Sequence, residues 1–355
     1  MKQKLFFIGL GIFFVAAGVA HYTHQGPILQ FILSCVAVIF VAGFLGKATE
    51  SVAHYAGERV GGFLNATFGN AAELIIAIIL IKDAVNGKPQ LFEMVKASIT
   101  GSIIGNLLLV LGLSVLLGGI KFKTQRYNVM LAGHNASLML LAVIALFIPA
   151  MFFTKLTPGE TNTLSLVVAG ILIVCYFLWL YFSMVTHKDE LADSQVVDEH
   201  QEVPWSKGRS ILYLVVATVM VALVSEWLVG TVEEFAHLFG LSELFVGAFL
   251  IAIIGNAAEH SAAVMLAMKN KIGAAVEIAI GSSLQIALFV APVLVFISFF
   301  MGETMNIVFT VAELVAIGVS VFIAKSISRD GSTNWYEGVL LIAVYLILGI
   351  AFFLV

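Results

Sequence analysis

The sequence Gly69-Asn70-Ala71-Ala72-Glu73 returns unchanged as Gly255-Asn256-Ala257-Ala258-Glu259, and each copy stands within a long apolar stretch. A charged side chain at the centre of a membrane helix costs roughly 2.5 to 3.5 kcal/mol on translocon scales. A chain that carries this cost twice, in the same pentapeptide, has a use for both acids. The two copies therefore predict a functional site within an apolar fold.

The composition around these motifs is that of a polytopic membrane protein. Hydrophobic residues make up 61 % of the 355 residues and charged residues 11 %, and the mean hydropathy is +1.05. Soluble domains are about half apolar. Because a bilayer core about 30 Å thick needs about 20 apolar residues per helix, we expect an all-α fold of 11 spans. These cover residues 5–20, 27–46, 61–81, 94–118, 128–153, 162–185, 210–229, 244–268, 273–299, 305–325 and 336–355.

Basic residues predict the orientation of these spans. Of the 18 Lys and Arg, most fall on one side, which the positive-inside rule assigns to the cytoplasm. The amino terminus is then cytoplasmic and the carboxyl terminus outside. The inner set is Lys2, Lys4, Lys47, Arg59, Lys121, Lys123, Arg126, Lys188, Lys207, Arg209, Lys269, Lys271, Lys325 and Arg329; the outer set is Lys82, Lys88, Lys96 and Lys155.

An acidic polar segment, residues 187–208, divides the chain. It is a predicted cytoplasmic linker, either a solvated loop or a cation attractor or sensor. Residues 1–26 hold a peripheral first span and loop, which we expect to be retained, although its basic start also fits a cleaved signal peptide. Five spans then lie in residues 27–186 and five in residues 209–355. Because five is odd, the two repeats must have inverted topology, a 1 + 5 + 5 layout.

Further matches between the halves favour duplication. Each motif glycine follows another glycine at the same spacing, and similar residues recur downstream of each motif. The matched pairs are Gly61 and Gly247, Gly101-Ser102 and Gly281-Ser282, Asn128-Val129-Met130 and Asn306-Ile307-Val308, and Asn135 and Glu313.

Inverted repeats usually bring discontinuous helices together near the membrane midplane, where the substrate binds. Asn70 and Glu73, like Asn256 and Glu259, are three residues apart, so amide and carboxylate share one helix face. We therefore expect these four side chains to converge. Paired carboxylates with amide and carbonyl oxygens around them suit a hard cation such as Ca²⁺, and Glu73 and Glu259 are its predicted metal ligands.

Other chemistry lacks its sequence motifs. His260 follows Glu259, but no His-Glu-x-x-His sequence supports a membrane metalloprotease. The chain has no phosphate-binding Gly-x-x-x-x-Gly-Lys-Ser/Thr motif, no soluble region large enough for an ATPase, and no paired nucleophile and base. An enzyme is therefore not expected, and transport must use an ion gradient.

The paired acids also indicate which gradient. Desolvation and like charge both disfavour the simultaneous ionisation of two close carboxyl groups. The site is neutral with protons on the acids, or with one divalent cation between two carboxylates. Either neutral form crosses the alternating-access barrier more easily than the empty dianion, which is the minimal logic of a divalent cation/proton antiporter.

The motif residues resemble a known family. The run Asn65-Ala66-Thr67-Phe68-Gly69-Asn70-Ala71-Ala72-Glu73-Leu74-Ile75-Ile76 is similar to the first repeat motif of the bacterial-type Ca²⁺/H⁺ exchangers (CAX) of the Ca²⁺/cation antiporter superfamily, and Gly255-Asn256-Ala257-Ala258-Glu259-His260 is similar to the second. The resemblance extends from about Gly46 to the carboxyl end. It implies that Glu73 and Glu259 hold Ca²⁺ and exchange it for protons, with Asn70 and Asn256 beside them.

Two alternatives remain. The Na⁺/Ca²⁺ exchangers resemble the same plan but usually carry proline before the motif glutamate, where this chain has Ala72 and Ala258. This difference favours proton coupling over Na⁺ coupling. A divalent-cation channel could instead use the paired acids as a selectivity filter.

Secondary site candidates follow each motif. Gln285 is the preferred extra ligand, because its repeat counterpart is Gly105, whereas Asn106 faces Ile286 and so lacks a symmetrical partner. Polar side chains in such helices either bond neighbouring helices or face the site. The candidates of this kind are Ser102, Asn106, Ser282, Ser283 and Gln285.

Two further residues are open in role. His134 could relay protons, since an unperturbed histidine titrates near about 6.5, or it could be a structural histidine. Glu313 is an acid without a first-half counterpart, and it could serve a portal or proton pathway or reach the membrane interface.

The expected partners are Ca²⁺, H⁺ and the lipid bilayer, without nucleic acid or nucleotide. No cofactor is expected, since Ca²⁺ is a transported substrate. A homo-oligomer is possible but not predicted, and the expected location is a prokaryotic plasma membrane, with Ca²⁺ leaving as protons enter.

Overall fold

The computed structural model describes residues 2–56, 61, 64, 67–187, 205–327 and 330–354. Most of the predicted acidic linker, residues 188–204, and residues 65–66 of the first motif run lie outside this part. Within it, nine helices are long and apolar enough to cross a membrane. Helix α4 (Ala71–Val85) and helix α15 (Val311–Ile327), with 15 and 17 residues, are shorter. Joined where one element continues into the next, the described elements make 11 helices.

The chain forms two compact units, and each contains residues from both halves of the sequence. The first unit comprises Met1–Val95 and Gln201–Glu259, and the second comprises Lys96–His200 and His260–Val355. Two helices pass from one unit to the other, α5 (Leu91–Ile104) and α12 (Ala252–Ala267).

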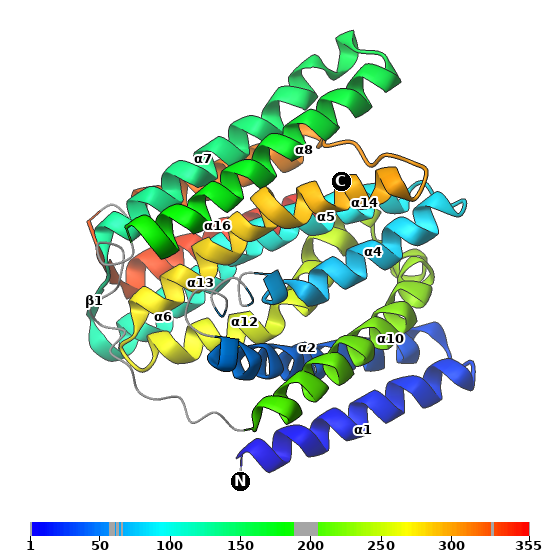
Figure 1. The fold of residues 1–355 in the computed structure, drawn as a ribbon, viewed down its shortest axis with the longest axis horizontal. Coiled ribbons are helices and arrows are strands. Elements are labelled where there is room, and N and C mark those ends of the chain that lie inside the picture. Colours follow the sequence, from blue (N-terminus) through cyan, green and yellow to red (C-terminus); the bar gives the residue numbers. More distant parts are fainter. Residues whose placement is uncertain are drawn as a thin grey trace. The chain divides into compact units, whose positions relative to one another are not determined.

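In the first unit, α2 packs along α10, α1 covers α2, and α4 lies against α10 (Figure 1). Close approach depends on small residues: a Cβ on Gly18 of α1 would lie 3.0 Å from the Trp227 ring. Helix α10 ends at Gly240, whose φ of 64° is the left-handed conformation that glycine adopts without strain. The elements are α1 (Lys2–Tyr22), α2 (Pro27–Ala56), α4, α10 (Lys207–Phe239), α11 (Glu243–Phe245), the π-helix η4 (Val246–Ile251) and the start of α12.

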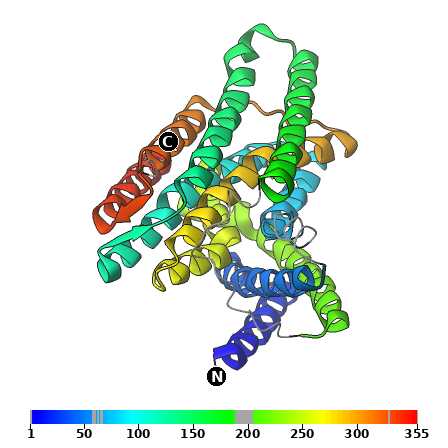
Figure 2. The ribbon, with the colours of Figure 1, turned by 60° about the vertical axis from the view of Figure 1, so that its left-hand side comes forward.

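In the second unit, α7 and α8 form a long hairpin (Figure 2), α6 packs on α16, and α14 packs on α8. Its elements, besides most of α5 and the end of α12, are η1 (Gly105–Val110), α6 (Leu111–Phe122), β1 (Thr124–Arg126), α7 (Val129–Phe152), η2 (Phe153–Lys155), α8 (Pro158–Tyr181), η3 (Phe182–Thr186), α13 (Ile272–Gln285), η5 (Ile286–Val290), α14 (Ala291–Phe300), α15, β2 (Ser332–Asn334) and α16 (Trp335–Leu354).

Large apolar side chains remain exposed along the helices. On α16 alone they include Leu346, Ile347 and Ile350, each more than half exposed. Such surfaces are stable where the surrounding medium is lipid, while the helices satisfy their own backbone hydrogen bonds. The protein is therefore an integral membrane protein.

Three details differ from the sequence expectation. The predicted span 61–81 is interrupted by a turn at Gly69 and Asn70: the described residues 61, 64, 67 and 68 before the turn are helical, and α4 begins after it at Ala71. The predicted span 305–325 begins as helix at Val311, because residues 305–310 are not helical. The fold is also not wholly α-helical, since β1 and β2 pair antiparallel, with Gln125 opposite Thr333.

Candidate functional site

The two copies of the pentapeptide adopt different backbones in the first unit. In the first copy, Gly69 and Asn70 form a turn, and Asn70 stands at the cap of α4 with φ −99° and ψ 23°. In the second copy, all five residues lie inside α12, directly after π-helix η4. Glycine and asparagine thus interrupt a helix in one copy only, and the irregular backbone of the other precedes the motif.

Glu73 lies directly against the second motif. A Cβ built on Gly255 would stand 3.1 Å from Cγ and 3.3 Å from Oε1 of Glu73. These separations are tighter than nine in ten real Cβ contacts, so glycine is what lets α4 and α12 approach at this point. The first motif's carboxylate is therefore brought onto the backbone of the second motif.

The two motif acids also interact electrostatically. Glu73 is buried, with 9 % of its surface exposed, and Glu259 is near enough to act on it electrostatically. Oε2 of Glu73 accepts no hydrogen bond from the described residues. Leaving a buried carboxylate oxygen without a donor costs free energy, and a proton or a cation at that oxygen removes the cost.

The two asparagines are each 1 % exposed. The backbone oxygen of Asn70 accepts from Leu74 N at 3.0 Å, which begins α4. The Asn256 side chain donates from Nδ2 to Ala252 O at 2.8 Å, so its nitrogen serves the helix and its oxygen is the end chemically suited to a cation. Glu73, Glu259, Asn70 and Asn256 all belong to the first unit.

The described residues contain no group of three or more His, Cys, Asp or Glu arranged to hold a metal ion. The oxygen-bearing side chains of the two motifs are the carboxyl groups of Glu73 and Glu259 and the amides of Asn70 and Asn256.

The other candidates belong to the second unit. Ser283 is fully buried and donates to Ala279 O at 2.9 Å, with Ile103 O at 3.5 Å, so α13 lies next to the end of α5. Ser102 and Ser282 are buried, and Gln285 is half-buried at the end of α13. Gln285 immediately precedes the π-helix η5, and the serines lie within one helical turn or so before η1 or η5, a type of distortion that is frequent at functional sites.

The Asn106 side chain has a hydrogen-bond partner that the sequence did not predict, His260. Its Oδ1 lies 3.1 Å from Nε2 of His260, the residue after Glu259, while its Nδ2 finds no partner among the described residues. Since the asparagine oxygen accepts, His260 carries its proton on Nε2 in this contact. The sequence showed His260 but gave no sign of this bond, because the two residues lie on separate helices.

Glu313 is a structural acid in this conformer. Its Oε2 accepts from N and Oγ1 of Thr310, both at 2.8 Å, and Thr310 Oγ1 accepts from the Glu313 backbone, which makes a capping box at the start of α15. Thr100 donates to the other carboxylate oxygen at 3.2 Å. Buried Lys96, which donates to Val308 O at 2.8 Å, adds an attractive charge. The Thr310-x-x-Glu313 spacing was a readable signal for this cap, whereas Lys96 and Thr100 gave none.

His134 is exposed on α7, and its ring lies 5.5 Å from the ring of Phe182 and 6.2 Å from that of Trp179. This setting gives His134 an aromatic packing role. No described contact joins it to a motif acid.

The chain is similar to known proteins over nearly its whole length. The model of the sodium/calcium exchanger protein family matches residues 26–185 and 209–354. The Ca²⁺/H⁺ antiporter ChaA of Bacillus subtilis is 44 % identical over 360 residues, covering 99 % of both chains. The Ca²⁺/H⁺ antiporter of Aphanothece halophytica is 44 % identical, covering 99 % of this chain and 97 % of its own.

Among solved structures, native YfkE superimposes with a TM-score of 0.86 at 41 % identity, covering 99 % of this chain and 100 % of its own. The chain belongs to the sodium/calcium exchanger protein family, and within it to the Ca²⁺/H⁺ exchangers that its paired motifs resemble.

Proposed function

We propose that this protein exchanges Ca²⁺ for H⁺ across the membrane by alternating access, with Glu73 and Glu259 binding either one Ca²⁺ or protons. The observation that carries this proposal is the placement of the Glu73 carboxylate against Gly255, within electrostatic reach of Glu259. Relatives 44 % identical over nearly the whole chain are named Ca²⁺/H⁺ antiporters.

The exchange follows from charge balance. Two carboxylates close together in a buried setting repel each other, so the site is stable when neutral. One Ca²⁺ neutralises both acids, and so do two protons. Each neutral form can pass through the occluded state, whereas the empty dianion is held back, and this difference couples the two ions.

We propose Asn70 and Asn256 as the neutral oxygen ligands beside the acids. Ser102, Ser282, Ser283, Asn106 and Gln285 are secondary polar positions, with Gln285 preferred. His134 and Glu313 are weaker candidates, since the contacts of each suit a structural role.

The 1 + 5 + 5 layout, with inverted repeats at residues 27–186 and 209–355, is part of the proposal. Two observations support it. The family model matches two separate stretches that avoid residues 1–25 and 186–208. The π-helices η1 and η5 begin at Gly105 and Ile286, within one position of each other in the register that pairs Ser102 with Ser282.

The orientation is likewise proposed from the distribution of Lys and Arg, with the amino terminus and the acidic linker in the cytoplasm of a bacterial cell and the carboxyl terminus outside. Proton influx would then drive Ca²⁺ efflux. A carboxyl-terminal reporter found in the cytoplasm would overturn this placement.

The test is a flux assay in reconstituted vesicles with pH and Na⁺ gradients imposed independently. The pH gradient alone should drive Ca²⁺ uphill, and Glu73→Gln and Glu259→Gln should each abolish the movement. Glu303→Gln, at an exposed loop position, is the matched control and should transport normally. Uphill movement driven by Na⁺ but not by pH would establish the Na⁺-coupled alternative, and uncoupled dissipation of the Ca²⁺ gradient would establish the channel.

A further inference from the structure

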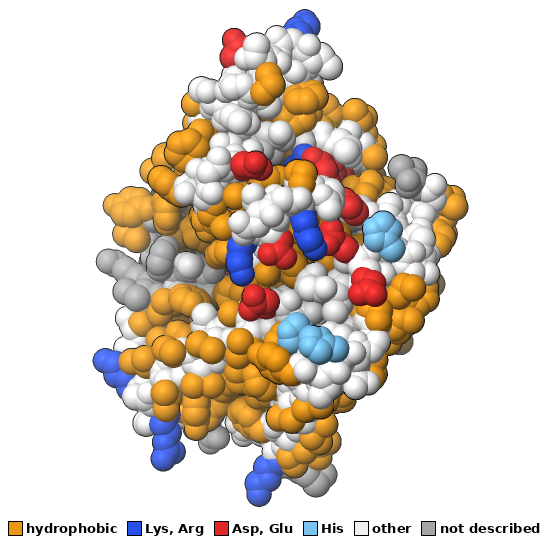
Figure 3. All heavy atoms as spheres, turned by 90° about the vertical axis from the view of Figure 1, so that its right-hand side faces the viewer, with side chains coloured by type: hydrophobic (Ala, Val, Ile, Leu, Met, Phe, Trp, Pro, Cys, Tyr) orange, Lys and Arg blue, Asp and Glu red, His pale blue; other side chains and the backbone are white. Residues whose placement is uncertain are grey.

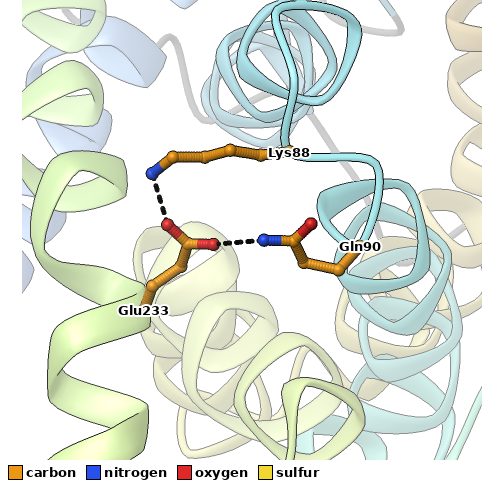
Figure 4. Close-up of polar contacts among 3 residues, drawn as sticks. All are labelled: Lys88, Gln90 and Glu233. Atoms are coloured by element: carbon orange, nitrogen blue, oxygen red, sulfur yellow. Dashed lines mark hydrogen bonds and ion pairs between the residues drawn. The ribbon is translucent and has the colours of Figure 1, made fainter.

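Charged side chains gather at the carboxyl-terminal ends of α4 and α10 in the first unit. Figure 1 shows both helices ending at the same edge, and Figure 3 shows acidic and basic side chains grouped amid apolar surface on that face. Lys88, in the loop after α4, donates to Oε2 of Glu233 on α10. Gln90 donates to Oε1 of the same carboxylate at 2.9 Å (Figure 4). Both oxygens of Glu233 are thus held by the segment that follows α4.

A second ion pair joins the same two segments. Nζ of Lys82, in the last turn of α4, lies 3.5 Å from Oε1 of Glu226 on α10. Glu226 and Glu233 are seven residues apart, about two helical turns, so both lie on one face of α10. Helices α4 and α10 pack together along this face.

The Glu233 pair is the better protected of the two. The Glu233 side chain is 24 % exposed, whereas the Glu226 side chain is 58 % exposed. The hydrogen bond to Glu233 raises the pKa of the Lys88 ammonium above its ordinary value, so Lys88 stays charged at neutral pH. Other charged side chains lie near this contact: Glu243 interacts electrostatically with Glu233, His237 and Glu93.

We propose that Glu233 is a positioning residue that, through Lys88 and Gln90, latches the end of α4 to α10 and so favours the conformer closed on this side of the membrane. The proposal rests on the proposed exchange function. Glu73 lies at the opposite end of α4, so a movement of α4 along α10 that changed access to Glu73 would have to break the latch. Lys82 and Lys88 belong to the smaller set of basic residues, which the positive-inside rule assigns to the outer side of the membrane, so the latch lies on the outer side.

The latch sets the balance of conformers and does not block their exchange. An exposed ion pair contributes little, up to about fivefold in an equilibrium constant. Breaking it should therefore increase the minor, outward-open population by up to that factor. Ca²⁺ applied from a given side binds with an apparent affinity reduced by the fraction of protein open to that side.

The test compares the half-saturating Ca²⁺ concentration in right-side-out and everted vesicles. Glu233→Gln should lower the value on the outer face by up to about fivefold and raise the cytoplasmic value by less, because the outward-open state is the rarer one. Glu226→Gln should act in the same direction but more weakly, and Glu303→Gln should change neither value. The charge exchange Lys88→Glu with Glu233→Lys should restore the wild-type values.

If the contact were merely structural, its loss would raise the half-saturating Ca²⁺ concentration on both faces of the membrane. Shifts of the same sign, no shift, or failure of the charge exchange to restore the values would each overturn the latch.

A second readout is independent of the transported ions. In a Cys35→Ala, Cys175→Ala background, Ala84→Cys places a thiol at a buried position near the end of α4, only 1 % exposed. A membrane-impermeant thiol reagent outside should label it up to about fivefold faster when Glu233→Gln is added. Unchanged labelling overturns the latch even if exchange is normal, and faster labelling supports it even if the coupling ion is not H⁺.

Discussion

The first pentapeptide begins a helix after a turn, whereas the second lies within a continuous helix after a π-helical stretch. The five residues are identical, so the difference comes from their surroundings. If the two halves are inverted repeats, a conformer in which both copies had the same backbone would present the site equally to both sides of the membrane. A transporter that opens to one side at a time must break this symmetry, and the two copies of this structure differ at the turn of Gly69 and Asn70.

The first test compares a motif acid, Glu73, with an acid outside both copies, Glu313. Glu73→Gln removes one of the two charges proposed to neutralise Ca²⁺, and H⁺-driven Ca²⁺ uptake should fall by at least about 100-fold, since even outer-shell changes at metal sites cost 10- to 100-fold. Glu313→Gln keeps a side chain able to serve the capping box but removes a charge facing Lys96. Its thermal unfolding temperature in detergent should fall while most transport remains.

Uptake and unfolding measured on both variants separate the two roles. If Glu313→Gln abolished uptake at an unchanged unfolding temperature, Glu313 would belong to the ion pathway and not to the cap.

A methyl group added to each copy should reveal their asymmetry. Gly255→Ala places a Cβ 3.1 Å from Cγ of Glu73 and must displace the carboxylate, so the half-saturating Ca²⁺ concentration should rise about tenfold, as small misplacements in a site do. Gly69→Ala changes an exposed turn residue and should alter it by less than about twofold. Equal effects in the flux assay would mean that the two glycines have equivalent surroundings.

The copies also differ in the residue after the glutamate, which is Leu74 in one and His260 in the other. His260→Leu leaves Asn106 without its described partner and should cost about 1 to 3 kcal/mol of stability. Adding Asn106→Leu should recover part of the loss. A double-mutant cycle on unfolding temperatures measures this coupling, and strictly additive losses would show that the bond contributes nothing.

A modest effect is expected from the asparagines. Asn70→Ala and Asn256→Ala should each raise the half-saturating Ca²⁺ concentration by about two- to fivefold, the value of one neutral contact. Equal shifts would indicate that both amides face the ion. A shift at only one of them would show that the site is as asymmetric as the backbones around it.

The sequence predicted much of this arrangement because its strongest signals are physical. Apolar stretches of membrane length located the helices, and the repeated pentapeptide singled out Glu73 and the motif of Gly255, which the structure places in contact. The start of α15 was misplaced because residues 305–310 are not helical although they include the buried apolar side chains of Met305, Ile307 and Phe309, so hydropathy alone could not separate them from the helix.

Other features could not be read from the chain. The strands β1 and β2 are three residues each, too short for an alternating pattern. The bond between Asn106 and His260 and the latch at Glu233 join residues more than a hundred positions apart, which one sequence does not connect. The difference between the two pentapeptides is invisible by definition, since their letters are the same.

The interleaving of the two compact units bears on how the protein is made. The unit that contains Glu73 is complete only when residues up to Glu259 have been synthesised. At about 5 to 20 residues per second, the first acid waits on the order of ten seconds or longer in the translocon or the lipid before its counterpart arrives. During biogenesis, Glu73 therefore enters the bilayer before Glu259 exists, and protonation can neutralise its carboxyl group in the meantime.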